Sequence, residues 1–479
     1  MNKANILVAS NRGPVSFSQA DDGSLSLRRG GGGLVSGLSA AAAGAGTVWV
    51  CAALSEADRL AVREAPGGRL DEAGHDTGGI AVHMIDVPED TFHRAYNTVA
   101  NSVLWFVHHL LFDTPNAPAF DAAFRADWAA YRDYNGAFAD ALVAESADGA
   151  RVFVQDYHLT LTPRMLRDRR PDLRIAHFSH TPWAPPEYYR LLPADIGREV
   201  LTGILGADEV GFLTERWADA FLDCCAAFLD AEIDHRTRSV SFGGRVVRVG
   251  VYGLGVDGPA MQERAAAEDV AERREALRAQ VGDRRLIVRV DRTELSKNIV
   301  RGLAAYREFL TDHPEWHGRV VHLAFAYPSR HDLPEYRAYT EAVRRTAEEI
   351  NAEFGTEGWV PLILQVKDDY PRSLAAYQLA DVLVVNPIRD GMNLVAKEGP
   401  VLSQGGCALV LSTEAGAAGE LGDDALLVNP YDVSETARAL HAALEQSDDE
   451  RKQRTARLAD AATMLPPQRW FAAQAERLG

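Results

Sequence analysis

The sequence predicts an α/β protein with two doubly wound domains in series. The chain has 479 residues, which suits two or three domains of roughly 100–200 residues each. Its apolar fraction of 47% is enough to fill large cores. Short apolar runs rich in β-formers alternate with helix-like patterns from end to end. This alternation is typical of parallel sheets covered by helices on both faces.

The first series of elements fills residues 1–255, which we predict to be the N-terminal domain. Amphipathic patterns predict helices over residues 119–146 and 214–229. Buried strands are predicted at Ile6–Ala9, Thr47–Ala52, Val152–Gln155, Arg174–Ser179 and Val246–Val251.

The second series fills residues 256–460, the predicted C-terminal domain, and opens with a charged helix at Glu263–Gln280. Its strands are predicted at Leu286–Val290, Val320–Phe325, Leu362–Gln365, Val382–Asn386, Ala408–Ser412 and Ala425–Val428. Residues 461–479 are predicted to form a further helix. It carries Trp470 and Phe471, whose apolar rings need a surface to pack against. We expect this helix to pack back on the N-terminal domain.

The composition excludes several classes of function. The formal charge is −18, so we expect neither a nucleic-acid partner nor an anionic membrane surface. The four cysteines have no CxxC spacing, which argues against a metal site or disulfide framework and favours a reducing cytoplasm. Residues 1–12 lack the long apolar run of a signal peptide, and 30–54 is too rich in Gly and Ala for a membrane span. A homo-oligomer is left open.

Polar residues and glycines follow the first strand. Ser10-Asn11-Arg12 comes directly after it, and four glycines, Gly30 to Gly33, follow further on. Glycines let backbone N–H groups approach a phosphate closely. The spacing is not GxGxxG, because Ser36 stands where the third glycine would be, so a dinucleotide site is disfavoured. A flexible loop is the alternative.

Asp156 and His180 each follow a buried strand of the first domain. Ligands of doubly wound sheets bind outside the carboxyl ends of the strands, so both side chains are predicted at the same rim. Together they could orient hydroxyl groups or share a proton. Each alone is more often a structural hydrogen-bonding group.

Arg292 and Lys297 lie five residues apart, where the first strand of the second domain passes through a loop into a helix. Two cations there suit a diphosphate leaving group, whose developing charge needs stabilisation. The alternative is a solvated charged loop, in which Glu294 forms an ordinary salt bridge.

The strongest signal is the segment from Asn386 to Glu398, where a buried strand, a glycine turn and a helix starting near Asn393 follow one another. The free N–H groups of a helix start can bind phosphate oxygens. Asp390 at the turn can accept from sugar hydroxyls, and Glu398, two turns into the helix, from a ribose diol. This pattern indicates a sugar-nucleotide site.

In combination, these segments resemble the trehalose-phosphate synthases of glycosyltransferase family 20 over nearly the whole chain. Tyr96, Asn101, Leu104 and Trp105 also match. The matching segments are SNRGPV at 10–15, GGLVSG at 32–37, VQDYHLTLTPRMLR at 154–167, HTPWAPPEYYRLLP at 180–193, GADEVGF at 206–212, DRTELSKN at 291–298, PSR at 328–330, RDGMNLVAKE at 389–398 and EAGAAGELG at 414–422.

The resemblance implies two facing Rossmann-like domains with the active site in the cleft. It implies a retaining hexosyltransferase that uses neither cofactor nor metal and moves glucose from a nucleoside-diphosphate-glucose to glucose 6-phosphate, giving trehalose 6-phosphate. The leaving phosphate is then expected to take the proton of the attacking hydroxyl. The implied catalytic residues are Arg292, Lys297, His180, Asp156 and Asp390. The implied donor-binding residues are Gly32, Gly33, Tyr370, Asp368, Gly391, Met392, Asn393, Leu394, Val395 and Glu398. The implied acceptor-binding residues are Arg12, Tyr96, Trp105 and Arg330, with Asp156 beside them.

The donor loop departs from the familiar family pattern at Thr293-Glu294-Leu295 and at Lys297-Asn298. The loop expected near the base contains Asp368 and Asp369, and a carboxylate accepts well from guanine but repels the carbonyl edge of uracil. GDP-glucose is therefore our favoured donor, with UDP-glucose as the alternative. Two solvated acids remain the plainer interpretation.

Two other functions compete with this one. A coupling enzyme that joins a nucleotide-cyclitol to an aminocyclitol phosphate would keep the fold, but the intact RDGMNLVAKE segment argues against it. A non-catalytic regulatory paralogue predicts loss of Arg292, Lys297 or Glu398, and all three are present.

Overall fold

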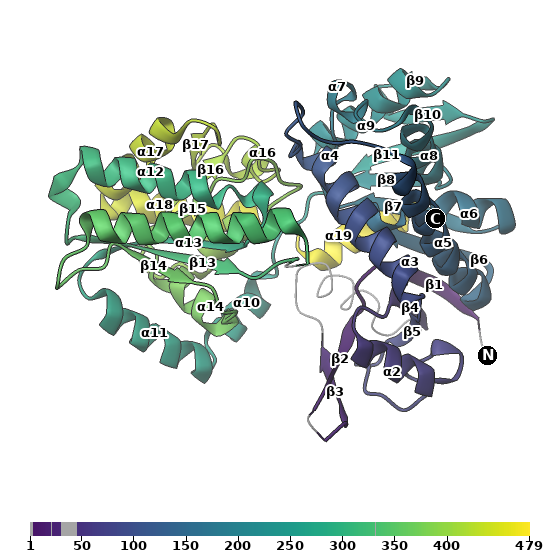
Figure 1. The fold of residues 1–479 in the computed structure, drawn as a ribbon, viewed down its shortest axis with the longest axis horizontal. Helices are drawn as coiled ribbons and strands as arrows, with labels where there is room; N and C mark the ends of the chain where they lie inside the picture. The colour runs from purple at the N-terminus through teal and green to yellow at the C-terminus, as the bar shows by residue number, and fades with distance from the viewer. Residues whose placement is uncertain (1–2, 21, 30–45, 331) are drawn as a thin grey trace. The chain divides into compact units, whose positions relative to one another are not determined.

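The computed structural model describes residues 3–20, 22–29, 46–330 and 332–479. The chain divides into two compact units, one comprising Met1–Leu254 with Pro467–Gly479 and the other Gly255–Pro466. Each unit is an α/β fold built on a largely parallel sheet (Figure 1), which confirms the predicted fold class.

The first unit contains a nine-stranded sheet among the described residues, in the order β5-β4-β1-β6-β7-β8-β11-β10-β9. The strands from β5 to β11 are parallel, and β10 and β9 are antiparallel to their neighbours. Chain order reverses between β1 and β6, and ligands bind at such a point. The strands are β1 (Ala4–Ala9), β4 (Thr47–Ala52), β5 (Ala81–Ile85), β6 (Ser146–Gln155), β7 (Arg174–Ser179), β8 (Glu209–Phe212), β9 (Glu232–Asp234), β10 (Ser239–Phe242) and β11 (Arg245–Val251).

A separate hairpin, β2 (Val15–Gln19) with β3 (Leu25–Arg29), precedes β4. The helices of this unit are α2 (Glu56–Glu64), η1 (Pro66–Gly68), α3 (Glu89–His93), the π-helix η2 (Arg94–Leu104), α4 (Trp105–His109), α5 (Ala122–Glu145), η3 (Tyr157–Leu159), α6 (Thr162–Arg169), α7 (Pro186–Tyr189), α8 (Ala194–Ile204), α9 (Glu215–Phe228) and α19 (Pro467–Arg477). Helix α19 packs on the sheet, with Phe471 against Phe153 of β6 and Trp470 against Phe178 of β7.

The second unit contains a six-stranded, fully parallel sheet in the order β14-β13-β12-β15-β16-β17. This is the doubly wound order 3-2-1-4-5-6, whose switch point lies between β12 and β15. The strands are β12 (Arg285–Arg292), β13 (Val320–Tyr327), β14 (Leu362–Gln365), β15 (Val382–Val385), β16 (Ala408–Ser412) and β17 (Leu426–Val428).

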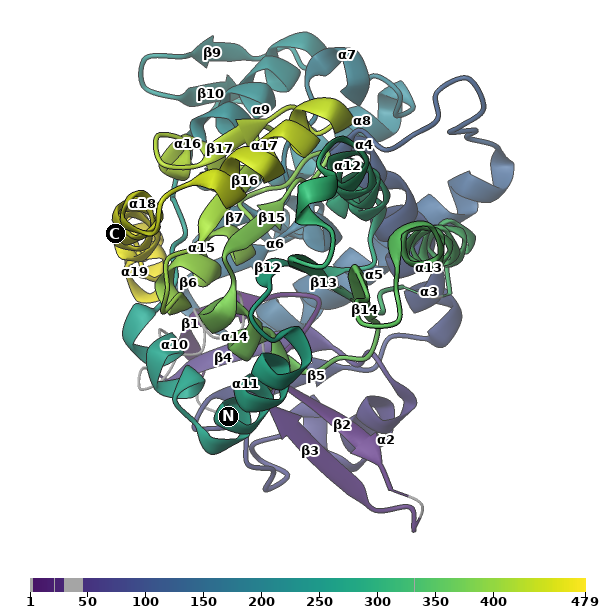
Figure 2. The same ribbon diagram turned by 90° about the vertical axis from the view of Figure 1, so that its left-hand side faces the viewer.

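Helices cover both faces of this second sheet, and Figure 2 shows α12 and α13 on one face with α14 and α15 on the other. The helices are α10 (Gly258–Ala265), α11 (Glu268–Val281), η4 (Leu295–Lys297), α12 (Ile299–Asp312), η5 (Pro314–Trp316), α13 (Pro334–Phe354), α14 (Tyr370–Leu379), α15 (Val395–Leu402), α16 (Ala418–Leu421), α17 (Val433–Glu445) and α18 (Asp448–Thr463).

The expected continuous helix at Glu263–Gln280 is wrong, because α10 and α11 are separated at Ala266–Ala267. Ala267 has extended backbone, with φ −66° and ψ 153°. The residues here are good helix formers, so nothing local forces the break. Helix α10 packs on α15 while α11 packs on α14, and one straight helix would not follow both surfaces.

A buried arginine joins the elements at the switch point of the second unit. Arg289 of β12 is 0% exposed, and its Nε and Nη2 donate to Oδ2 of Asp291 at 3.1 and 2.9 Å. Nη2 also donates to the carbonyl of Lys297 and to Oδ1 of Asn386, both at 3.0 Å. Gly302 of α12 provides the space, since a Cβ there would lie 2.2 Å from Arg289 Nη1.

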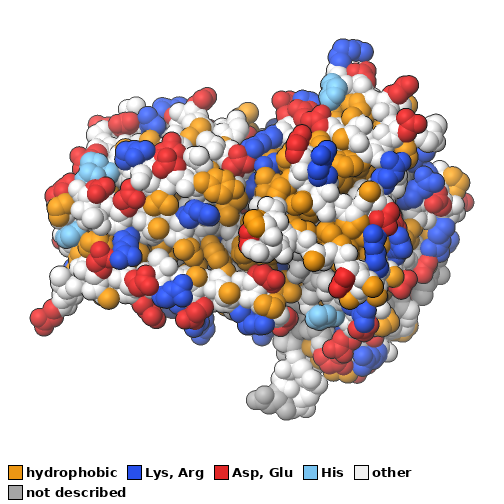
Figure 3. Space-filling model, turned by 45° about the horizontal axis from the view of Figure 1, so that its top comes forward, with side chains coloured by type: hydrophobic (Ala, Val, Ile, Leu, Met, Phe, Trp, Pro, Cys, Tyr) orange, Lys and Arg blue, Asp and Glu red, His pale blue; other side chains and the backbone are white. Residues whose placement is uncertain are grey.

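Within the described residues no helix is long and apolar enough to cross a membrane. On the face shown in Figure 3, acidic and basic side chains are interspersed. Exposed ion pairs among the described residues, such as Arg264 with Asp269 and Arg307 with Glu353, contribute little to stability.

We predict that Arg289→Met lowers the free energy of unfolding of the second unit by about 3–5 kcal/mol, because it leaves Asp291 buried without its main counter-charge. Chemical denaturation of the intact chain measures this change. Arg264→Met, at an exposed ion pair, serves as the control and should leave the transition nearly unchanged. Equal effects of the two substitutions would contradict the role of the buried network.

Candidate active site

The loop after β12 carries two of the predicted cations. Arg292 is half exposed, and its Nη1 lies 3.2 Å from Oε1 of Glu294. The backbone N–H of Glu294 donates to the carbonyl of Arg292 at 2.7 Å, which forms a tight turn. The short helix η4 then places Lys297 beside the next loop.

Lys297 and Asp390 meet across the switch point of the sheet. Nζ of Lys297 donates to Oδ2 of Asp390 at 2.6 Å, and both side chains are largely buried. Burial opposes protonation of Lys297, but the charges of Asp390, Glu294 and Asp291 outweigh it and raise the pKa of the lysine. The lysine is therefore a fixed positive charge at the carboxyl ends of the strands, as its sequence position predicted.

The loop after β15 is fixed by contacts with the loop after β16. The N–H of Asp390 donates to the carbonyl of Glu414, and the carbonyl of Asp390 accepts from the N–H of Gly416. The two backbones approach so closely that a Cβ on Gly416 would lie 2.0 Å from the carbonyl oxygen of Gly391. This close approach requires glycine at residue 416.

Asn393 forms the start of the helix that follows. It has a left-handed backbone with φ 77°, its Nδ2 donates to Oδ2 of Asp390 at 3.0 Å, and its Oδ1 accepts from the N–H of Ala396 at 3.3 Å. Helix α15 begins at Val395, two residues after the predicted start, because the left-handed backbone of Asn393 cannot belong to the helix and Leu394 is its N-cap residue. Met392 is buried, whereas Leu394 and Val395 are partly buried.

Glu398 lies in the first turn of α15, so the expectation of two helical turns before it is wrong. Tyr377 donates to its Oε2 at 3.3 Å, and burial raises the pKa of the carboxyl group.

In the predicted base loop, Asp368 and Tyr370 are exposed. Both carboxylate oxygens of Asp369 already have partners. Its Oδ1 caps α14 by accepting from the N–H of Arg372, and its Oδ2 lies 3.0 Å from Nε of Arg273.

The first unit brings Asp156 and His180 together, as expected from their positions after neighbouring strands. Asp156 has a positive φ of 71°, and its Oδ1 accepts from the backbone N–H of His180 at 3.1 Å. Nε2 of His180 lies 2.9 Å from Oε1 of Gln155. Burial, together with the neighbouring His177, lowers the pKa of His180 to about 3, so its ring is neutral at physiological pH.

The C-terminal helix completes the surroundings of His180. The ring of Trp470 lies 5.5 Å from the imidazole and 4.8 Å from Phe178, as measured between ring centroids. The sequence indicated that Trp470 needed a surface to pack on, but it did not indicate which residue it would cover.

The predicted acceptor residues lie in different elements. Arg12 follows β1 and is exposed. Tyr96, in the π-helix η2, stacks between Phe92 and His158. Trp105 begins α4 directly after η2 and stacks on His109, with 3.8 Å between the ring centroids. A long π-helix is rare and is often found at functional sites, and no pattern in the sequence predicted it here.

Arg330 lies in the second unit, after β13, and its Nη1 donates to the hydroxyl of Tyr336 at 2.6 Å. The predicted phosphate-binding glycines Gly32 and Gly33 lie outside the described residues. The structure therefore groups Arg292, Lys297, Asp390 and Asn393 at one switch point, and Asp156 with His180 near the other.

The sequence patterns did not lead us to single out Arg289 and Asp291, whose ion pair fixes the loops after β12 and β15. The signal was available, since an arginine and an aspartate interrupt the otherwise apolar strand Leu286–Val290 and its continuation. Charged residues are almost never fully buried unless they are paired, so such an interruption indicates a buried ion pair.

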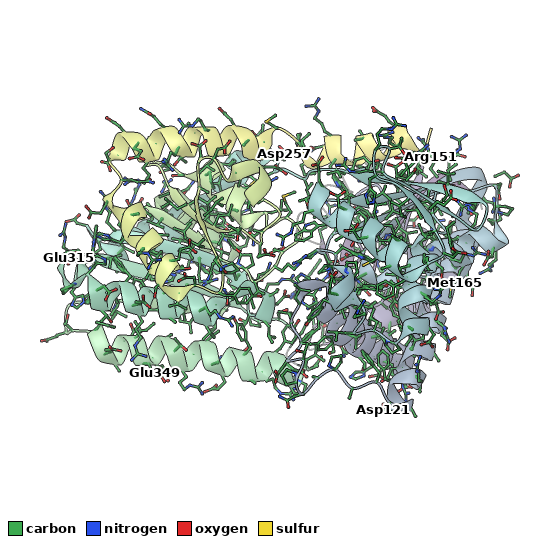
Figure 4. All side chains as sticks on the ribbon, turned by 90° about the horizontal axis from the view of Figure 1, so that it is seen from above. Asp121, Arg151, Met165, Asp257, Glu315 and Glu349 are labelled. Carbon is green, nitrogen blue, oxygen red and sulfur yellow. The ribbon has the colours of Figure 1, made fainter. Side chains whose placement is uncertain are left out.

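Elsewhere in the second unit, His313, Glu315 and His441 place one ligand atom each within 4.8 Å of the others. Figure 4 labels Glu315 at the edge of this unit. The two imidazole rings stack face to face, with centroids 3.6 Å apart and planes 12° apart. A single ion cannot lie in both ring planes at once, so this cluster is not preformed for a metal.

We predict that His180 makes the fold less stable below neutral pH. The unfolded chain takes up a proton at this residue near pH 6.5, whereas the folded chain does so only near its pKa of about 3. Between these two pH values the unfolded state binds more protons than the folded state. The contribution of His180 to the free energy of unfolding is therefore fully present above pH 6.5 and is lost as the pH is lowered, with a loss of about 1–2 kcal/mol at pH 5. Denaturation of wild type and His180→Asn at pH 7 and pH 5 measures the difference, and an equal loss in both would contradict the prediction.

Comparison with known proteins identifies the family. The model of glycosyltransferase family 20 matches residues 4–479. Alpha,alpha-trehalose-phosphate synthase (UDP-forming) 1 of Aspergillus fumigatus is 34% identical over 456 residues, covering 94% of this chain and 85% of that protein. The UDP-forming synthase of Schizosaccharomyces pombe is 33% identical over 460 residues, covering 94% and 86% respectively.

Solved structures show the same fold. A structure described as trehalose-6-phosphate from E. coli bound with UDP-2-fluoro glucose has a TM-score of 0.86 and 29% identity, covering 99% of this chain and 98% of that one. The UDP-forming synthase of Burkholderia xenovorans in complex with glucose-6-phosphate has a TM-score of 0.86 and 26% identity, covering 99% and 100%. The resemblance seen in the sequence is therefore confirmed, and the chain belongs to glycosyltransferase family 20.

Proposed function

We propose that this protein is a retaining α,α-trehalose-phosphate synthase that transfers glucose from UDP-glucose to glucose 6-phosphate. The observation that carries this proposal is the group of Arg292, Lys297, Asp390 and Asn393 at the switch point of the second sheet. The relatives from Aspergillus fumigatus and Schizosaccharomyces pombe are named UDP-forming synthases, and the Burkholderia xenovorans structure is a complex with glucose-6-phosphate.

In this proposal, the second unit binds the donor. Arg292 and Lys297 face the diphosphate, and their charges stabilise the negative charge that develops as the glycosidic bond breaks. Lys297 is held at 2.6 Å from Asp390, so its position is set before the substrate arrives. Asp390 accepts from hydroxyls of the transferred glucose, Glu398 accepts from the ribose, and the backbone of Gly391–Val395 surrounds the phosphates.

The first unit supplies groups for the sugar hydroxyls and the acceptor. His180 is neutral, so its ring can exchange hydrogen bonds with a hydroxyl group without adding charge. Asp156 orients the backbone of His180 through a 3.1 Å hydrogen bond. Arg12, Tyr96 and Trp105 contact glucose 6-phosphate, with Arg330 as a second cation for its phosphate. The leaving phosphate takes the proton of the attacking hydroxyl.

The expected preference for GDP-glucose is not supported. The relatives are named UDP-forming. Asp369 already accepts from the N–H of Arg372 and pairs with Arg273, so it is not free to recognise guanine. Asp368 is exposed, which fits a solvated acid on the surface of the loop.

We predict that nucleoside diphosphate is released fastest from UDP-glucose, and only when glucose 6-phosphate is present. The measurement is a coupled release assay with UDP-, GDP- and ADP-glucose, with and without the acceptor. Asp368→Ala should leave the ratio of UDP to GDP release unchanged. Faster release from GDP-glucose, or a ratio that changes in this variant, would restore the guanine hypothesis, and no release from any donor would refute the transferase.

We predict that Lys297→Met lowers kcat by about 10²–10³-fold with a smaller change in KM for UDP-glucose, because the lysine acts mainly on charge that develops in the transition state. Steady-state kinetics at saturating glucose 6-phosphate measure both constants. Lys452→Met, the same substitution at an exposed position of α18, is the control. An increase in KM alone would assign Lys297 to ground-state binding instead.

A further inference from the structure

Glu294 is a buried carboxylate at the carboxyl end of β12. Its side chain is 0% exposed, whereas that of Arg292, two residues before it, is 56% exposed. The N–H of Glu294 donates to the carbonyl of Arg292, and its carbonyl accepts from the N–H of Lys297 at 3.0 Å. The turn thus directs the arginine outward and the glutamate into the protein.

One oxygen of Glu294 connects two loops of the second unit. Oε1 accepts from Oγ of Ser329 at 2.9 Å and lies 3.2 Å from Nη1 of Arg292. Ser329 follows β13 and directly precedes Arg330, so the carboxylate joins the loop after β12 to the loop after β13. Its other oxygen, Oε2, is buried without a hydrogen-bond partner among the described residues.

A buried carboxylate remains charged only where positive charge compensates for the lost hydration. Burial alone would raise the pKa of Glu294, but the charges of Arg292, Arg330 and Lys297 outweigh it and lower the pKa to about 2. The group is therefore an anion at neutral pH, placed among the cations that the proposed function assigns to substrate phosphates.

Arg330 is fixed from two directions. Its backbone adopts a left-handed conformation with φ 45°, next to the Ser329 that Glu294 anchors. Its guanidinium donates to the hydroxyl of Tyr336 and lies 5.5 Å from the centre of that ring. The glutamate therefore supplies both an anchor and a counter-charge for this arginine.

We propose that Glu294 is a positioning residue that orients Arg292 and Arg330 together, so that one carboxylate aligns the cation for the donor diphosphate with the cation for the acceptor phosphate. This inference rests on the proposed function. Guanidinium groups that are oriented in advance can stabilise charge in the transition state without reorganising during the reaction. Because Glu294 also offsets one positive charge, removing its charge should misalign the arginines without weakening their general attraction for phosphate.

The test is Glu294→Gln, which keeps the shape of the side chain and an oxygen that can accept from Ser329. We expect kcat to fall by about tenfold or more, while KM for each substrate changes by less than about threefold. Glu294→Asp, which retains the charge on a shorter side chain, should recover part of the lost kcat. Glu209→Gln, at a buried carboxylate of the first unit that pairs with Arg248, is the matched control and should retain wild-type kcat per folded protein.

A second readout does not depend on turnover. In the ¹⁵N-arginine NMR spectrum, the Nε–H signals of Arg292 and Arg330, assigned with Arg292→Lys and Arg330→Lys, should be sharp in wild type and exchange-broadened in Glu294→Gln. Unchanged signals together with kcat within twofold of wild type would overturn the inference. A wild type that is inactive with every donor refutes the proposed function, whereas the NMR comparison still decides whether Glu294 positions the arginines.

Discussion

The buried ion pair of Arg289 and Asp291 is the interaction on which the second unit depends. A guanidinium that is 0% exposed requires a partner for each donor nitrogen. It finds them in Asp291, Asn386 and the carbonyls of Lys297 and Ile299. Lys297 and Asn386 belong to the segments that follow β12 and β15, on the two sides of the switch point. Burying this pair costs hydration energy, and one arrangement of the loops that carry Lys297 and Asp390 supplies the hydrogen bonds that offset the cost. Any other arrangement would leave buried charges unpaired.

Further ion pairs extend this arrangement toward the surface. Lys297 contacts Asp390, and Arg292 contacts Glu294, so both cations after β12 have a carboxylate beside them. The pKa of Lys297 is raised and that of Glu294 is lowered, because each group's charge favours ionisation of the groups around it. A site of this kind keeps its charges in the absence of substrate, which is the arrangement that electrostatic stabilisation of a leaving group needs.

The first unit differs in that the buried ring of His180 carries no charge at neutral pH. His180 is covered by Trp470 and bonded to Gln155, and Asp156, between β6 and η3, has a positive φ of 71°. Burial keeps the imidazole neutral. The covering tryptophan comes from the last helix of the chain, so the environment of a residue near the middle of the sequence is completed only when the C-terminus has folded onto the sheet.

The sequence by itself determined the fold class, because the alternation of buried strands with amphipathic helices depends on local periodicity. It also predicted where the candidate site residues lie. Asp156 and His180 directly follow β6 and β7, and Lys297 and Asp390 lie in the segments after β12 and β15, which the order of parallel strands brings together. Tertiary structure alone decided what depends on contacts between distant residues. The break at Ala266–Ala267 follows from packing on two helices. The hairpin of β2 with β3 and the short strands β9 and β10 lack a strong sequence pattern. The ion pair of Asp369 with Arg273 joins two separate helices. Tertiary structure also decided the burial of Arg289 and Glu294, because a charged side chain is stable inside a protein only where the complete fold supplies its partners.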